Sequence, residues 1–111
     1  MLFVFNIITM NISSVNNAEK LNFALDAWKL TSSGNIEIIE LHLAVGETLD
    51  LHPNPLDVIF YVVHGKGEFF TENTKAQVNK GDCFPFEKKT LRGWCNTGQD
   101  ILKLLVIKIQ V

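Results

Sequence analysis

The sequence is poor in cysteine, with Cys83 and Cys95 the only two among 111 residues. They are too far apart for a Cys-x-x-Cys metal or redox pair, and two cysteines make no disulfide framework. They could form a single disulfide, but we expect free, half-buried thiols in a reducing cytoplasm.

The chain also lacks an excess of charge of either sign, with 10 basic and 12 acidic residues and a formal net charge of −2. Such a balance gives no broad attraction to nucleic acid or to an anionic membrane, so we expect neither as a partner. The chain is long enough for one domain only. Because 47% of its residues are hydrophobic and 20% charged, it can bury enough apolar surface to fold alone.

The N-terminal stretch, residues 1–10, is apolar but shorter than the roughly 20 residues of a transmembrane helix. It also lacks the basic region and the cleavage pattern of a signal peptide. Two interpretations stay open. The stretch is either a strand with Phe3, Phe5 and Ile7 on one face, docked on a partner subunit, or an extension upstream of a start at Met10.

Residues 18–30 have a helical pattern, because Leu21, Leu25 and Trp28 follow i, i+4, i+7 spacing. The pattern ends at the turn residues of 31–35, so we expect one or two helical turns. Residues 1–35 are therefore predicted to form an N-terminal strand and a short helical or irregular arm.

From residue 36 onward the pattern is that of β-strands, rich in β-branched and aromatic residues and separated by turn residues. Strands are predicted over 36–43, 58–63, 68–71, 75–78, 82–86, 91–95 and 101–109. Short strands at a spacing of about 8–12 residues indicate a sandwich or a closed barrel. The fold class is therefore all-β, with residues 36–111 forming the barrel of a single structural domain.

The stretch from Gly46 to Gly65 resembles the first motif of the cupin family. His52 follows Gly46 at the expected distance, but Asn54 replaces the second histidine of that motif. Val58 stands where the motif has glutamate, and Gly65 closes the motif in register.

A second stretch resembles the second cupin motif. Gly81 opens it, Glu87 replaces its proline, Lys89 replaces its glycine, and Arg92 replaces its histidine. Asn96 stands at its expected position. The resemblance covers residues 36–109 and implies a double-stranded β-helix, or jelly roll, that commonly dimerises.

The resemblance also implies a metal site, but this chain keeps one of the four family ligands, His52. Asn54 is a weak donor, Val58 is none, and a guanidinium about 4 Å from a divalent ion would oppose binding by up to about 8 kcal/mol. Asp57 would face outward unless a bulge intervened. We therefore expect no cofactor, with a transition metal at His52 as the alternative.

The resemblance places His52, Asn54 and Arg92 inside the barrel, where they would line a polar pocket. Tyr61 and Trp94 are further candidates whose facing depends on strand register. Arginine offers a planar fork of donors that suits a carboxylate or a phosphate. The pattern therefore predicts a pocket for a small polar or anionic ligand.

A purely structural interpretation stays open. Arg92 could pair with Glu40, Asp57 or Glu87, and His52 could be a core histidine that donates to a backbone carbonyl.

Three function classes follow. We expect a metal-free binder of a small molecule rather than an enzyme. The first alternative is a metal-dependent dioxygenase, isomerase or decarboxylase with an atypical site around His52, which could also act as a general base without metal. The second is a dimerisation module with a vestigial pocket. In each case we expect a cytoplasmic homodimer.

Overall fold

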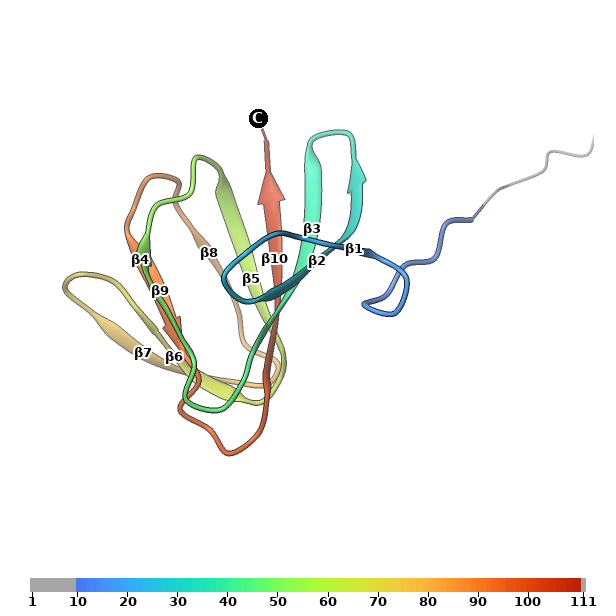
Figure 1. Ribbon diagram of the computed structural model, residues 1–111. Coiled ribbons are helices and arrows are strands. Elements are labelled where there is room, and N and C mark those ends of the chain that lie inside the picture. The colour runs from blue at the N-terminus through green and yellow to red at the C-terminus, as the bar shows by residue number, and fades with distance from the viewer. Residues whose placement is uncertain (1–9, 111) are drawn as a thin grey trace, which may run out of the picture.

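The computed structural model describes residues 10–110, which form ten β-strands and no helix (Figure 1). The strands are β1 (Glu19–Lys20), β2 (Asp26–Ser33), β3 (Ile36–Leu43), β4 (Thr48–His52), β5 (Asp57–His64), β6 (Lys66–Phe70), β7 (Lys75–Asn79), β8 (Cys83–Phe86), β9 (Arg92–Cys95) and β10 (Leu102–Ile109). The all-β prediction is confirmed. Within this range no helix could cross a membrane.

Two antiparallel sheets face each other (Figure 1). The larger has the strand order β1-β2-β3-β10-β5-β8, and the smaller has the order β4-β9-β6-β7. The last strand of the chain, β10, lies between β3 and β5, and it pairs with β3 along its whole length and with β5 over 103–109. Strands from the beginning and the end of the barrel, β3 and β10, are therefore neighbours in one sheet.

The core lies between the two sheets because side chains alternate along each strand. On β10 the inward residues Leu102, Leu104 and Val106 are buried, and on β5 Val58, Phe60 and Val62 are buried in the same way. Each such side chain contributes about 1.5–3 kcal/mol on burial. The continuous apolar runs in the sequence thus become the inner layer of the larger sheet.

Aromatic rings join the two sheets. Phe69 and Trp94 come from the smaller sheet, and Phe60 and Phe84 from the larger. The ring centroid of Phe69 lies 5.0 Å from that of Trp94 and 4.9 Å from that of Phe84. These edge-on contacts add about 0.5–1.5 kcal/mol each beyond area burial.

The prediction of helical turns over 18–30 is wrong, because this segment contains β1 and β2. Ala27 pairs with Leu41 on β3 and is buried, whereas Trp28 lies on the opposite face against the ring of His42. Pairing with β3 therefore overrides the helical spacing. β4 was also not predicted as a strand. Residues 1–9 lie outside the described residues, so the N-terminal strand stays a prediction.

A tight turn joins β5 and β6 at Gly65, whose φ is 82°. A Cβ at this position would lie 2.5 Å from the carbonyl oxygen of Ile101. Both the positive φ and the close backbone approach require glycine. Nearby, the buried Asn96 donates from Nδ2 to the carbonyl oxygens of Leu43 and Asp100, each at 2.9 Å. This side chain ties the strand ends together at the closed end of the barrel.

Candidate binding cavity

A cavity of about 270 Å³ lies between the two sheets, and most of its wall is apolar. The apolar side chains that line it are Leu21, Phe23, Ala27, Ile39, Leu41, Leu49, Pro53, Phe60, Trp94 and Val106. Leu21 and Phe23 come from the segment between β1 and β2, which crosses the barrel opening (Figure 1). The N-terminal segment is thus part of the site.

Four polar residues line the same cavity: His52, Asn54, Arg92 and Lys108. No Asp or Glu is among the described side chains of its wall. The cavity therefore combines two fixed positive charges with an apolar wall. Three of these residues were predicted, and Trp94 is a fourth predicted member.

Arg92 begins β9 and is the only arginine of the chain. Its side chain is 1% exposed. Nη1 donates to the carbonyl oxygen of Thr90 at 3.3 Å, whereas Nε has no hydrogen-bond partner. The guanidinium carbon lies 5.9 Å from the ring centroid of Phe60 and 5.6 Å from that of Phe86. Burial lowers the pKa of Arg92 from its ordinary value.

Of the three acids proposed as structural partners of Arg92, Glu40 and Asp57 make other contacts, and Glu87 lines a different pocket. Glu40 pairs with His42. Asp57 Oδ1 accepts the backbone N–H of Lys88 at 2.8 Å. Across residues 10–110 no ion pair involves Arg92. The guanidinium is therefore a buried cation, and the groups that stabilise its charge are two aromatic rings and one carbonyl oxygen.

His52 and Asn54 flank this cation from the end of β4 and the following loop. His52 Nδ1 donates to the carbonyl oxygen of Asp50 at 2.9 Å, which leaves Nε2 as the ring's acceptor. Asn54 Oδ1 accepts the N–H of Leu56 at 3.0 Å. The amide NH₂ of Asn54 therefore remains as a donor, and its carbonyl is already used.

The loop that leads to Arg92 holds a strained residue. Lys89 has a φ of 67°, in the left-handed region that favours glycine, and its N–H donates to the carbonyl oxygen of Asn54 at 2.8 Å. Lys89 stands where the second cupin motif has glycine. The bond joins the loop that carries Asn54 to the loop that leads into β9, so it helps to position Asn54 and Arg92.

The residues present do not fit a transition-metal ion. In the described part of the chain, no group of three or more His, Cys, Asp or Glu side chains could hold a metal. His52 is paired in register with Arg92, Asn54 presents a donor, and Val58 is buried without a ligating atom. A site of this kind needs several imidazole or carboxylate groups.

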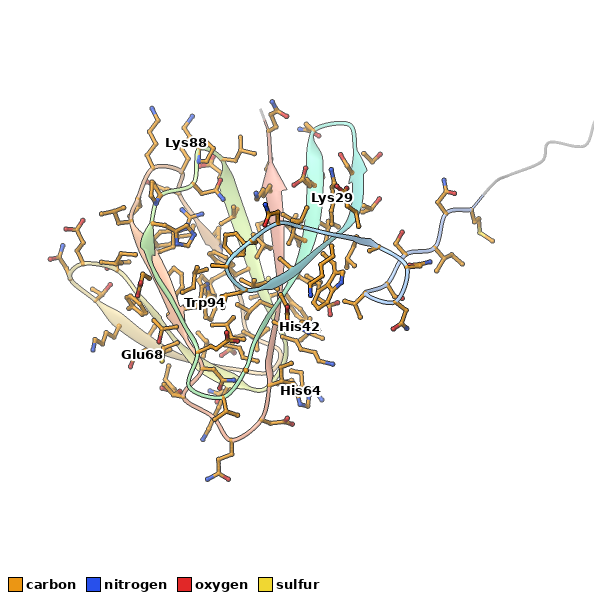
Figure 2. The ribbon with its side chains drawn as sticks, viewed as in Figure 1. Lys29, His42, His64, Glu68, Lys88 and Trp94 are labelled. Carbon is orange, nitrogen blue, oxygen red and sulfur yellow. The ribbon has the colours of Figure 1, made fainter. Side chains whose placement is uncertain are left out.

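Tyr61 does not line the cavity, contrary to the prediction for it. It is 38% exposed and pairs with Leu105 on the outer face of the larger sheet, while its neighbour Phe60 points inward. Trp94 is 1% exposed and lies between the sheets (Figure 2). Lys108 was missed, although it follows Leu102, Leu104 and Val106 in the inward alternation of β10.

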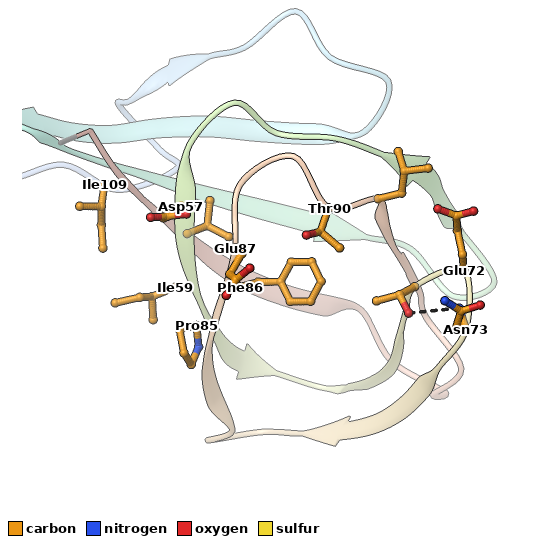
Figure 3. Close-up of a pocket in the computed structure, with 12 residues that line it drawn as sticks. Asp57, Ile59, Glu72, Asn73, Pro85, Phe86, Glu87, Thr90 and Ile109 are labelled. Atoms are coloured by element: carbon orange, nitrogen blue, oxygen red, sulfur yellow. Dashed lines mark hydrogen bonds between the residues drawn. The ribbon is translucent and has the colours of Figure 1, made fainter.

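A second, more open pocket of about 750 Å³ has the opposite electrostatic character (Figure 3). Its acids are Asp57 on β5, Glu72 in the β6–β7 turn and Glu87 after β8, and no Lys or Arg is among its described lining residues. Such a surface repels anions. The cavity around Arg92 is thus the site whose charge and apolar wall together suit a small molecule.

Comparison with known proteins agrees with this architecture. A family model described as a cupin domain matches residues 39–108. No curated protein matches the sequence.

Solved structures match over most of the chain. A predicted oxalate decarboxylase from Thermotoga maritima has a TM-score of 0.79 at 16% identity, over 91% of this chain and 100% of that one. The polyketide cyclase RemF from Streptomyces resistomycificus has a TM-score of 0.78 at 12% identity, over 91% and 80%. A Cupin 2 conserved barrel domain protein from Salinispora arenicola has a TM-score of 0.77 at 14% identity, over 96% of this chain and 92% of that one. The predicted double-stranded β-helix is confirmed, and at these identities the likeness concerns the fold.

Proposed function

The chain belongs to the cupin family, and from this premise we propose that its barrel binds a small anionic ligand without a metal ion. The observation that carries the proposal is Arg92, a buried guanidinium in a mostly apolar cavity that has no carboxylate partner within residues 10–110.

The energetics favour an anion at this position. A buried donor without a partner costs about 1–3 kcal/mol, and more when it is charged. A carboxylate about 4 Å from the guanidinium would gain about 4 kcal/mol at an effective dielectric constant near 20. Lys108 adds a second positive charge at the same cavity, and no acid of its described wall opposes it. A bound anion would therefore offset the free-energy cost of burying Arg92 without a partner.

The other polar groups also point to an acceptor-rich ligand. The amide NH₂ of Asn54 and the indole N–H of Trp94 are donors, and neither has a partner within residues 10–110. A carboxylate or a phosphate accepts several such bonds at once. Arg92 is the anchor, while the NH₂ of Asn54 sets the orientation of the head group.

The experiment is a thermal-shift and calorimetric screen of acetate, butyrate, benzoate and inorganic phosphate against the intact protein. A ligand at 100 times its Kd should add about 2.7 kcal/mol to the free energy of unfolding. Arg92→Met should abolish the shift, whereas Lys88→Met, which removes the same charge from the outside of the barrel, should keep it (Figure 2). Equal binding by both variants would refute an anchoring role for Arg92.

The metal-dependent alternative around His52 has less support, since the available end of Asn54 is a donor and Arg92 is paired in register with His52. The proposal therefore assigns no step to a metal.

We also propose that the protein is a homodimer, because the outer face of the larger sheet carries an apolar patch. The outward residues of three adjacent strands are half-buried or exposed: Ile38, Ile59, Tyr61, Leu105 and Ile107. A second copy of the chain could cover this face with a twofold-symmetric contact. A dimerisation module with a vestigial pocket would need this face but not Arg92.

The two cysteines support a reducing compartment. Cys83 is exposed and Cys95 is half-buried, and both are free thiols. Free thiols of this kind persist in the cytoplasm, which is our proposed location.

A further inference from the structure

Two buried donors without partners lie on one face of β9. Arg92 and Trp94 are two residues apart, so their side chains leave the strand on the same side. Each is 1% exposed, and each lines the cavity. Arg92 Nε and Trp94 Nε1 are the buried side-chain nitrogens without a hydrogen-bond partner in the described structure. Buried polar groups are nearly always paired, so a pair of exceptions among the residues of one cavity points to a ligand that offers two acceptors.

Aromatic rings form much of the wall beside these donors. Phe60 and Trp94 contact each other edge to face, with centroids 5.4 Å apart and an interplanar angle of 75°. Phe23 lines the same cavity at its mouth, where it is 47% exposed. A planar ring entering this space meets ring faces and edges on two sides. Such contacts favour an aromatic body over a saturated one of equal size.

The size and polarity of the cavity exclude larger and more polar ligands. Its volume of about 270 Å³ is that of roughly nine water molecules, which suits one ring with its substituents. A sugar would place several hydroxyl groups against Ile39, Leu41 and Val106, whose side chains offer no hydrogen bond. The polar part of the ligand is therefore placed beside Arg92 and Trp94 on β9, away from these aliphatic side chains.

We infer that the ligand is a single-ring aromatic carboxylate with a second oxygen acceptor. Its carboxylate lies on Arg92, its ring against Phe60, and its second oxygen receives the indole N–H of Trp94. This inference rests on the proposed anion-binding function and specifies the class of its ligand. It also makes Trp94 a determinant of specificity in addition to its place in the core.

The test compares five acids by isothermal titration calorimetry: benzoate, cyclohexanecarboxylate and the three hydroxybenzoate isomers. Benzoate should bind about 2–10-fold more tightly than cyclohexanecarboxylate, because the two differ in aromaticity at similar size. At least one hydroxybenzoate should bind about 2–10-fold more tightly than benzoate. That second gain should disappear in Trp94→Phe, and Trp28→Phe, on the outer face against His42, should retain it.

A second measurement remains informative if Trp94→Phe does not fold. In Trp28→Phe the indole N–H resonance of Trp94 is the only one of its kind, since the chain has two tryptophans. The best hydroxybenzoate should shift this resonance downfield, as hydrogen bonding does, and cyclohexanecarboxylate should not.

The outcomes separate the two proposals. If cyclohexanecarboxylate binds as tightly as benzoate, or if the hydroxybenzoate gain survives in Trp94→Phe, the inference on ligand class is overturned while anion binding stands. If no carboxylate or phosphate binds and Arg92→Met changes nothing, both fail.

Discussion

His52 and Arg92 are cross-strand partners, paired in register between β4 and β9. The one residue that keeps the identity of a family metal ligand thus lies beside a fixed positive charge that has replaced another ligand. Both side chains line the same cavity. In the family this strand pairing would bring metal ligands together, and under the proposed function it brings together the residues that hold an anion.

Arg92→Met should separate stability from binding. The substitution removes a buried cation without an acidic partner and leaves an apolar side chain of similar length, so the free energy of unfolding of the unliganded protein should rise by about 1–3 kcal/mol. Affinity for a carboxylate such as benzoate should fall at least about 30-fold. Thermal melts and calorimetry measure the two effects. A clear loss of unliganded stability would instead assign Arg92 a structural role.

The protein should bind no transition metal stoichiometrically. After incubation with iron, nickel, manganese or zinc and removal of free metal, elemental analysis should find less than about a tenth of an equivalent, because the described residues of the cavity offer one imidazole and no carboxylate. His52→Ala should leave that value unchanged. One equivalent of metal, lost in His52→Ala, would restore the metal-dependent enzyme as the leading function.

Lys89→Gly should stabilise the protein. Lys89 has a φ of 67°, which costs a residue with a side chain about 1–2 kcal/mol and glycine almost nothing. After the entropy cost of glycine in the unfolded chain, the free energy of unfolding should rise by up to about 1 kcal/mol in a denaturant titration. The neighbouring Lys88→Gly, at a negative φ, should be neutral or destabilising. The opposite ranking would show that the Lys89 side chain makes a compensating contact.

Ile107→Lys should disrupt a dimer. Ile107 faces outward on β10, between Ile38 on β3 and Ile59 on β5. A lysine in the middle of a sheet-to-sheet contact would be buried without a partner, so light scattering should change from dimer to monomer. Gln77→Lys on the exposed edge strand β7 is the control and should leave the mass unchanged. A wild-type monomer would remove the dimer proposal.

The His64–Asp100 pair should contribute to stability above about pH 4. His64 Nε2 lies 2.7 Å from Asp100 Oδ2, and the hydrogen bond from His64 lowers the pKa of Asp100 from its ordinary 3.8. A carboxyl group with a lowered folded-state pKa stabilises the fold above its unfolded pKa, and this contribution is lost as pH falls through the folded value. Asp100→Asn should therefore melt below wild type at pH 6 by a margin that closes near pH 3. A margin that stays the same from pH 6 to pH 3 would contradict this contribution.

Sequence reasoning located most of the barrel because its signals are local. The runs that became β3, β5 and β10 are β-rich over eight residues each, and the turn at Gly65 needs a glycine for backbone reasons. β2 was missed, since the spacing of Leu21, Leu25 and Trp28 fits a helix equally well. Pairing with β3 decides its conformation, and that partner lies beyond the segment itself.

The sequence by itself also determined that three of four family metal ligands are replaced, because motif spacing is a property of the chain alone. It could not decide that Tyr61 faces outward. Both faces of β5 carry apolar residues, so only the pairing register with β10 determines which side chains point into the barrel. The tertiary structure alone decided that Arg92 has no acidic partner within residues 10–110, and that Asn54 presents its NH₂ rather than its carbonyl. Both depend on which distant groups come within hydrogen-bonding distance, and this is fixed only when the two sheets close on each other.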